Sequence, residues 1–270
     1  MPAQPEITNM ALFCDFENIA LGVRDANYAQ FDIRKVLERL LLKGSIVVKK
    51  AYCDWERYKE FKAPMHEAAF ELVEIPHVRQ SGKNSADIRM VVDALDLCYT
   101  KPHVDTFVII SGDSDFSPLV SKLRENDKYV IGIGVKAATS DLLAANCDEF
   151  IFYDDLVREQ EAKKKRGRAK GQKTAPGEKT ASGKSEEERR QEALDFLVET
   201  VEALATERGG EEKLWGSLVK QTMKRRKPGF NEAFYGYRSF GEMVEDAQAK
   251  KLLAVTRDEK TGQYMLRLPG

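Results

Sequence analysis

Short apolar segments, separated by charged or turn-forming residues, recur through the first 157 residues of the chain. Six of them are only five to seven residues long, and several are rich in Val, Ile, Phe and Tyr. This length and composition are typical of β-strands rather than stable helices. The predicted strands are Met10–Phe16, Ile46–Tyr52, Glu71–Pro76, Thr106–Ser111, Tyr129–Gly134 and Glu149–Tyr153.

Amphipathic segments lie between most of these strands. Residues 33–42 and 86–99 both carry apolar side chains at the three- and four-residue spacing of one helical face. In the second segment this face comprises Ile88, Val91, Val92, Leu95 and Cys98. Alternating strands and helices predict an α/β fold with a doubly wound parallel sheet. Because such sheets bind ligands at the carboxyl ends of their strands, the residues directly after each strand are the candidate site.

Acidic and polar side chains gather at two of these strand ends. The first strand ends at Asp15, and the fourth strand leads directly into Ser111, Asp113 and Asp115. A further acid, Asp87, stands at the start of the helix predicted over residues 86–99. Carboxylates that meet in one place repel one another unless a cation neutralises them. Their hard oxygen ligands suit Mg²⁺ or Mn²⁺.

Each of these side chains also has a simpler interpretation. Asp15 could cap a turn, Asp113 could form an Asx-turn, and Asp115 could cap the next helix. Lys83, just upstream of Asp87, could contact a phosphate or remain a solvated loop lysine. Asp93 lies about 240° around the helix from Asp87, so we expect it at the surface or behind the site.

Composition narrows the class of protein. The chain has 270 residues, 43 basic and 44 acidic, with 42% hydrophobic residues and a mean hydropathy of −0.47. No apolar run approaches the ~18 residues that span a bilayer, and no secretory signal pattern is expected. The four cysteines have no CxxC spacing, which argues against zinc and disulfides. We therefore expect a cytoplasmic protein with no membrane association.

The charge is unevenly distributed. Residues 1–157 carry a net charge of −7, whereas residues 158–185 contain ten basic and three acidic side chains. The second segment has no aromatic residue, and it predicts a disordered linker because it buries too little apolar surface to offset chain entropy. This basic linker is either a solubilising tether or an arm that binds phosphate backbones.

Residues 186–270 form a third, separate region. The pattern predicts a long first helix, then helices over Leu214–Lys224 and Ser239–Lys250. Two short strands, Leu252–Thr256 and Gln263–Leu268, follow on either side of a turn. Three helices and a hairpin are typical of a small winged-helix (α+β) domain. The expected organisation is thus 1–157, 158–185 and 186–270.

The segments DFEN, SADIRMVVDAL and SGDSDFSPLV together resemble the NYN domain, of the LabA-like branch of the PIN-like nucleases. The resemblance covers about residues 8–156. It implies a PIN-like fold and Mg²⁺- or Mn²⁺-dependent ribonuclease activity, and it allows a homodimer. By matching position, Asp15, Asp87, Asp113 and Asp115 would form the catalytic and metal-binding cluster, supported by Asn18 and Ser111. The family motif also has an acid at the position of Asp93.

Residues 187–268 resemble the OST-HTH/LOTUS domain, through the pattern PGF…YGYRSF. This resemblance implies RNA binding, and some members bind proteins instead. Six basic residues are candidates for phosphate contact: Lys220, Lys224, Arg225, Arg226, Lys227 and Arg238.

Two other functions stay open. One is a regulatory adaptor that binds RNA through an inactive nuclease domain. The other is a haloacid-dehalogenase-like phosphatase, although that family has Asp two positions after its first acid and this chain has Glu17.

Overall fold

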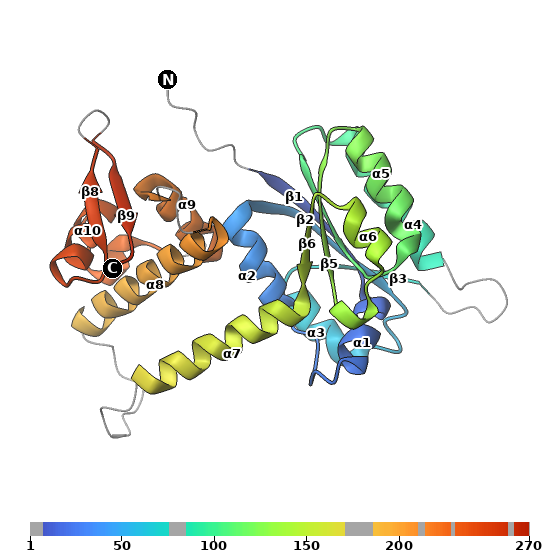
Figure 1. The fold of residues 1–270 in the computed structure, drawn as a ribbon, viewed down its shortest axis with the longest axis horizontal. Coiled ribbons are helices and arrows are strands. Elements are labelled where there is room, and N and C mark those ends of the chain that lie inside the picture. The colour runs from blue at the N-terminus through green and yellow to red at the C-terminus, as the bar shows by residue number, and fades with distance from the viewer. Residues whose placement is uncertain are drawn as a thin grey trace. The chain divides into compact units, whose positions relative to one another are not determined.

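The computed structural model describes residues 8–75, 85–170, 186–209, 214–227, 230–258 and 262–269. Of residues 162–170 it describes only the helical backbone. The chain divides into two compact units, one within Ile7–Lys173 and one within Thr174–Gly270, and each is described by itself (Figure 1). Within the described ranges, no helix combines the length and the hydropathy needed to cross a bilayer.

A six-stranded parallel sheet forms the centre of the N-terminal unit, in the order β3-β2-β1-β4-β5-β6. The strands are β1 (Asn9–Asp15), β2 (Ser45–Cys53), β3 (Glu71–Glu74), β4 (Thr106–Ile110), β5 (Tyr129–Gly134) and β6 (Glu149–Phe152). All six agree with the predicted strands to within two residues. The α/β fold with a parallel sheet is confirmed.

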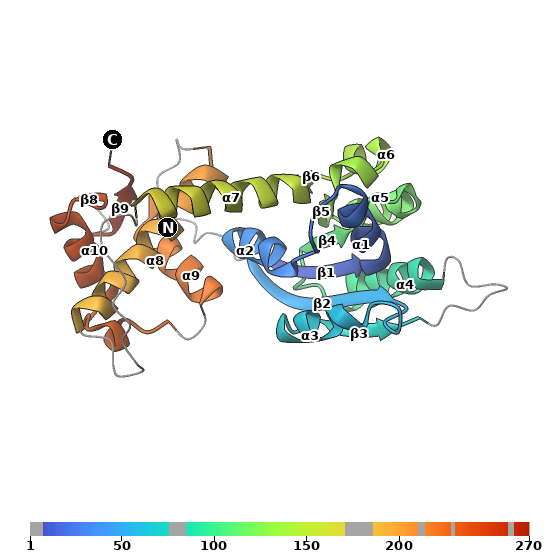
Figure 2. The same ribbon diagram turned by 90° about the horizontal axis from the view of Figure 1, so that it is seen from below.

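Helices cover both faces of this sheet (Figure 2). One layer contains α1 (Phe16–Asp25), α2 (Ile33–Lys43), α3 (Lys59–Glu67) and the start of α7 (Tyr153–Lys170). The other contains α4 (Ser85–Thr100), α5 (Ser117–Glu125) and α6 (Asp141–Asn146). Because the side chains of a strand alternate between the two faces of the sheet, β1 contributes to both cores. Leu12 packs against the first layer and Phe13 against the second.

The chain reverses its direction across the sheet between β1 and β4. It runs outward from β1 to β2 and β3, and α4 then carries it back to β4 on the other side of β1. After β1 the chain enters α1 in one helical layer, and after β4 it enters α5 in the opposite layer. The carboxyl ends of β1 and β4 are therefore the switch point at which this topology places a ligand.

Helix α4 buries a face that overlaps the predicted one only in part. Cys98 is buried as predicted, and Val91 and Leu95 pack against the core. The other buried side chains are Met90 and Ala94, whereas Ile88 and Val92 are exposed. The prediction was wrong for these two residues because α4 carries apolar side chains on two sides. Periodicity alone does not say which side meets the sheet.

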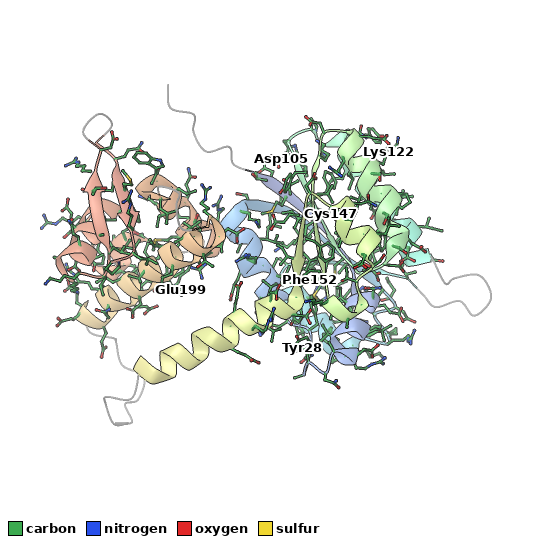
Figure 3. All side chains as sticks on the ribbon, in the orientation of Figure 1. Tyr28, Asp105, Lys122, Cys147, Phe152 and Glu199 are labelled. Carbon is green, nitrogen blue, oxygen red and sulfur yellow. The ribbon has the colours of Figure 1, made fainter. Side chains whose placement is uncertain are left out.

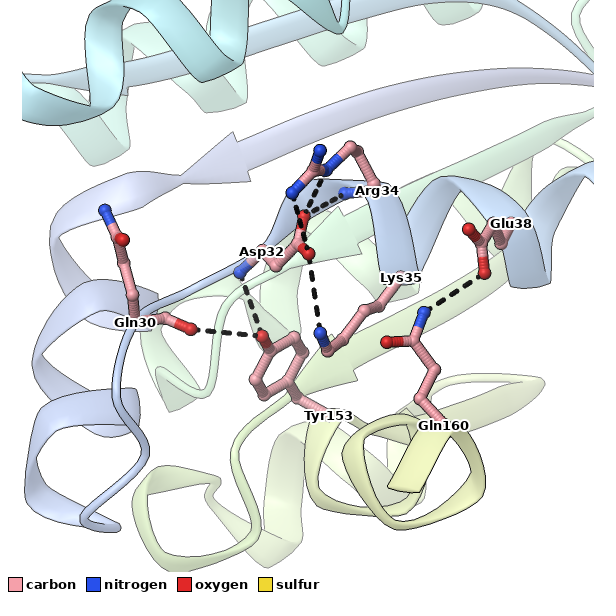
Figure 4. Close-up of polar contacts among 7 residues, drawn as sticks. All are labelled: Gln30, Asp32, Arg34, Lys35, Glu38, Tyr153 and Gln160. Atoms are coloured by element: carbon pink, nitrogen blue, oxygen red, sulfur yellow. Dashed lines mark hydrogen bonds and ion pairs between the residues drawn. The ribbon is translucent and has the colours of Figure 1, made fainter. Parts of the chain in front are cut away.

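Helix α7 corrects the predicted disordered linker. It continues to Lys170, so residues 158–170 are helical, and the remainder of the predicted linker lies outside the described residues. The start of α7 is anchored to α2 and the loop before it (Figure 4): the Tyr153 hydroxyl accepts from the Asp32 backbone N–H at 2.9 Å, and Gln160 donates to Glu38 at 3.2 Å. An anchored first turn removes the cost of nucleation, and the Ala, Glu, Lys and Arg residues that follow favour a helix.

The C-terminal unit contains α8 (Glu186–Glu207), α9 (Gly216–Arg226) and α10 (Phe240–Ala249), with a short 3₁₀ helix, η3 (Glu232–Tyr235). Its antiparallel sheet has the order β7-β9-β8, from β7 (Leu214–Trp215), β8 (Ala254–Arg257) and β9 (Tyr264–Arg267). The three helices and the hairpin were predicted. Strand β7 was not, because its two residues were assigned to the following helix.

Candidate functional site

Asp15 lies at the carboxyl end of β1, at the switch point of the sheet, and is only 8% exposed. Its Oδ2 accepts a hydrogen bond from the Ser111 hydroxyl at 3.0 Å. Its Oδ1 accepts from the Asn18 backbone N–H at 3.3 Å, which caps the start of α1. Asp15 therefore caps a helix, where its simpler interpretation expected a turn, and it is also a buried carboxylate at the candidate site.

Ser111 and Asn18 connect the ends of β1 and β4. Ser111 is fully buried, and its Oγ accepts from the Asp113 backbone N–H at 3.2 Å while it donates to Asp15. The Asn18 side-chain oxygen accepts from the Gly112 N–H at 2.9 Å. Hydrogen bonds thus link the residues at the end of β1 to those at the end of β4. These bonds fix the orientation of the Asp15 carboxylate.

Gly112 allows a third segment to approach this point. A Cβ at position 112 would lie 2.2 Å from the Ala138 carbonyl oxygen, a distance that no side chain tolerates. The Gly112 carbonyl accepts from the Ser140 N–H at 2.8 Å, just before α6. The absence of a side chain therefore positions the start of α6 beside the strand ends.

Asp113 and Asp115 follow β4 in a short 3₁₀ helix, η1 (Ser114–Phe116). Asp113 caps this helix by accepting from the Asp115 backbone N–H at 3.0 Å, so it too has a structural role. Asp115 is exposed. Together with Asp87 it lines a groove of about 740 Å³ between α4, α5 and α6, whose other walls are serines and apolar side chains.

Asp87 lies in the first turn of α4. Its pKa is raised, first by burial and then by the negative charges of Asp113, Asp115 and Glu17. Three acidic groups from two other segments therefore act electrostatically on Asp87. The sequence predicted this for Asp87, Asp113 and Asp115.

Two of the four candidate carboxylates, Asp15 and Asp87, have raised pKa values. Burial, and secondly the charge of Asp87, raise the pKa of Asp15 to about 7, against the lowering effect of the hydrogen bonds from Ser111 and Asn18. Among the described residues, none of Asp15, Asp87, Asp113 and Asp115 makes an ion pair. Acidic side chains that have raised pKa values and no ion-pair partner, and that lie at a switch point of the sheet, are typical of functional sites.

Asp93 shows the opposite arrangement on the same helix. It pairs with Lys50 at 3.2 Å and Arg89 at 3.0 Å, and accepts from the Tyr52 hydroxyl at 2.9 Å. Burial alone would raise its pKa, but the hydrogen bonds and charges of these partners lower it. Asp93 therefore ties α4 to β2, which explains an acid at this position without a role in the site.

The donor set fits a hard divalent cation in its chemistry and its charge. Carboxylate oxygens suit Mg²⁺ and Mn²⁺, and negative charge without an ion-pair partner favours a cation. In the positions of the described residues, however, no three acidic, His or Cys side chains converge into a ligand set. Lys83, the candidate phosphate contact, lies outside the described residues.

Glu17 belongs to the same electrostatic group, and the sequence analysis did not assign it to the site. It stands in the first turn of α1, raises the pKa of Asp87, and pairs with Arg57 at 3.0 Å. Its place in the DFEN segment, two residues after Asp15, was the available signal. The partner Arg57 is distant in sequence and could not be inferred.

Most of the candidate RNA-binding cations of the C-terminal unit have internal contacts. Lys220 pairs with Glu232 at 3.0 Å, and Lys227 lies 2.6 Å from the Tyr235 hydroxyl. Arg226, only 10% exposed, pairs with Glu199 at 2.6 Å. Glu199 is labelled on α8 in Figure 3.

Arg225 donates to the Thr222 hydroxyl, and its pKa is lowered first by burial and then by the charge of Arg208. Lys224 and Arg238 are exposed. Phosphate contact stays a prediction for all six cations, and among the described ion pairs none involves Lys224 or Arg238.

Comparison with known proteins finds a match to the NYN domain model over residues 9–154. An uncharacterized protein of Methanocaldococcus jannaschii is 29% identical over 140 residues, which cover 51% of this chain and 55% of that protein. The chain thus aligns with little more than half of that relative. A crystal structure of a Vibrio parahaemolyticus protein of unknown function matches with a TM-score of 0.50 and 26% identity, covering 57% of this chain and 98% of that one.

The ion pairs of Asp93 predict a structural role that can be separated from the site. Asp93→Ala leaves Lys50 and Tyr52 without their shared acceptor, and we expect it to lower the free energy of unfolding by about 1–3 kcal/mol. Urea denaturation measures this loss. The matched variant on the same helix, Asp87→Ala, removes an unpaired acid and should not destabilise the protein. Equal destabilisation by both substitutions would contradict the distinction.

The raised pKa of Asp15 predicts how stability depends on pH without divalent cations. Between its ordinary value of 3.8 and about 7, the folded protein binds a proton at Asp15 more tightly than the unfolded chain does. The free energy of unfolding should therefore fall as pH rises through this window, by about 2–4 kcal/mol from this group. Asp15→Asn should remove the fall, and the exposed-site control Asp96→Asn should keep it. Thermal or urea unfolding in EDTA at several pH values measures both, and an unchanged slope in Asp15→Asn would contradict the assignment.

Proposed function

Since the chain belongs to the NYN domain family, we propose that it is a divalent-metal-dependent ribonuclease that cleaves RNA phosphodiester bonds endonucleolytically. The observation that carries this proposal is the group of carboxylates at the switch point of the sheet, which have raised pKa values at Asp15 and Asp87 and no ion pair within the described part of the chain. By itself this group repels phosphate, and with a bound cation it attracts it. Asp15, Asp87, Asp113 and Asp115 are the residues that would hold Mg²⁺ or Mn²⁺.

When bound, such a cation polarises the phosphoryl oxygen and lowers the pKa of the attacking water. The chain's own residues prepare the site for it. Ser111 and Asn18 fix the Asp15 carboxylate by hydrogen bonds of 3.0 and 3.3 Å, Asn18 through its backbone N–H. The groove lined by Asp87 and Asp115 gives the RNA a path to these carboxylates. No covalent protein nucleophile is needed.

The C-terminal unit and the basic segment that precedes it are proposed to bind the RNA. The unit resembles the OST-HTH/LOTUS domain, and Lys224 and Arg238 are exposed on it. Tethering an RNA-binding unit to the nuclease unit raises the local concentration of substrate at the acidic site. The net charge of −7 on residues 1–157 makes such help useful.

A non-catalytic RNA-binding adaptor is the second candidate. It is favoured by one observation: Asp15 and Asp113 both cap helices, and no three acids converge among the described residues. The phosphatase alternative has no such support, because Glu17 is ion-paired with Arg57. Metal-dependent turnover of RNA distinguishes the nuclease from the adaptor.

Substitution of the site carboxylates tests the nuclease directly. Asp15→Asn and Asp113→Asn each preserve side-chain shape while removing a charge, and each should lower Mn²⁺-dependent cleavage of a labelled RNA by about 100-fold or more. Asp93→Asn, outside the site, is the matched control and should retain cleavage. Both site variants must show the far-ultraviolet circular dichroism of the wild type. Full activity in both would refute the proposed site.

The exposed cations of the C-terminal unit predict a separate effect on binding. Lys224→Glu with Arg238→Glu should weaken RNA binding about tenfold and reduce its dependence on salt, because fewer counterions are released. Lys59→Glu, an exposed lysine on α3 of the other unit, should change little. Fluorescence anisotropy at several salt concentrations measures both quantities. Unchanged affinity and salt dependence in the double variant would exclude these two residues from the interface.

A further inference from the structure

The groove between α4, α5 and α6 has walls of two different chemical kinds. One wall is an apolar face of α4, formed by Ile88, Val91 and Val92. The other follows η1 and α5 and carries hydroxyl groups at intervals of three and four residues, which places them on one side of the chain: Ser114, Ser117 and Ser121. Pro118 and Leu142 add apolar surface to the groove. An occupant that fits both walls has apolar surface and also forms hydrogen bonds.

Exposed apolar side chains gather in this groove. Ile88 is 63% exposed, Leu142 is 58% exposed and Val92 is 55% exposed. They are three of the six large hydrophobic residues that are exposed among those described in the N-terminal unit. Single exposed apolar side chains are ordinary on protein surfaces, whereas several that line one groove mark a binding surface.

Ser117, in the hydroxyl wall, has a polar atom without a partner. The residue is only 6% exposed, and its Oγ is buried and makes no hydrogen bond within the described part of the chain. A buried hydroxyl that is left unpaired costs free energy of folding. Rotation about χ1 turns a serine hydroxyl between staggered positions, so an occupant of the groove can supply the partner that the protein does not. Ser117 therefore indicates that the occupant carries hydrogen-bonding groups.

Charge decides which part of an RNA strand suits these walls. Asp87 lies in the first turn of α4 and Asp115 just before α5, and Asp115 acts electrostatically on Asp87. No Lys or Arg stands among the described residues that line the groove. A phosphate is therefore not attracted by the walls, and it is held only where a cation neutralises the carboxylates. The uncharged part of a nucleotide, its base, is the part that the walls accept.

We propose that this groove binds one base of the RNA, from a nucleotide next to the cleaved phosphodiester bond. The faces of the base pack against the apolar side chains, and its polar edge meets the serine hydroxyls. An unstacked base is planar, apolar on its faces and polar on its edge, which matches the two walls. Because a hydroxyl both donates and accepts, the hydroxyl wall suits more than one base. This inference rests on the proposed function, which places the phosphate at the carboxylates.

Nuclear magnetic resonance of the full-length chain tests base binding without any cleavage. The probes are uridine and adenosine 5′-monophosphates in Mg²⁺, and the control is ribose 5-phosphate, which has the same phosphate and no base. With labelled methyl groups, both nucleotides should shift the signals of Ile88, Val92 and Leu142 and show nuclear Overhauser effects from base protons to them. Ribose 5-phosphate should bind about tenfold more weakly or less, because it lacks the base. Equal effects of all three probes, or no effect at these methyl groups, would overturn the proposal and leave the groove to a protein partner.

Ser117→Ala separates a role in binding from a role in the fold. The substitution removes an unpaired buried hydroxyl, so the midpoint of thermal unfolding should stay the same or rise, while the affinity for uridine 5′-monophosphate should fall about fivefold. Ser45→Ala, on β2 outside the groove, should change neither quantity. A lower midpoint with unchanged affinity would assign Ser117 to the fold alone and contradict its role in the groove.

Cleavage of an RNA with a single abasic nucleotide shows where the base binds. At one position beside the cleaved bond, removal of the base should lower kcat/KM about tenfold in the wild type. Val92→Glu places a charge in the apolar wall, and it should lower kcat/KM on the intact RNA by a similar factor and remove the effect of the abasic position. Val47→Glu, an exposed valine of β2 outside the groove, should retain both the rate and that effect.

The two readouts separate this inference from the proposed function. A chain that cleaves RNA, but neither binds nucleotides in the groove nor responds to any abasic position, would overturn the base site and leave the nuclease. A chain that binds nucleotides through these methyl groups and cleaves no RNA would support the base site and overturn the nuclease.

Discussion

The N-terminal unit is organised around negative charge at the junction of β1 and β4, where the candidate carboxylates have no ion-pair partner among the described residues. Asp15 is buried there and held by Ser111 and by the start of α1, and its burial, followed by the negative charge of Asp87, raises its pKa to about 7. A fold selected only for stability has no reason to retain this arrangement, because protonation or substitution would relieve it. A positively charged ligand gives it a reason, and the NYN fold supplies the position.

The location of the candidate site could be predicted from the sequence because that location follows from topology. Apolar segments of strand length, alternating with amphipathic segments, predicted the parallel sheet, and parallel strands bring Asp15 and Ser111 to one edge. The distinction between Asp87 and Asp93 also followed from helical geometry. Glu17 was missed, because its role depends on the approach of α4 to the start of α1, which no local pattern encodes.

Other failures arose where composition or periodicity had two physical solutions. Residues 158–170 are too polar to form a core, yet they continue a helix whose first turn is anchored by Tyr153. Helix α4 has two apolar faces, and only tertiary packing decides which one meets the sheet. The basic residues of α9 suggested a phosphate-binding surface, but Arg226 and Lys227 are used within their own unit. Local sequence gives the charge, whereas the partner of that charge comes from the fold.

The most direct test of the account is to locate the cation itself. Anomalous difference density from a crystal of the full-length chain soaked with Mn²⁺ reports the metal's position without reference to any activity. The account predicts a peak bounded by Asp15, Asp87, Asp113 and Asp115, at the carboxyl ends of β1 and β4. Well-ordered carboxylates at that position with no Mn²⁺ density between them would contradict the account. So would a basic side chain of the chain itself that pairs with Asp15 in place of the metal.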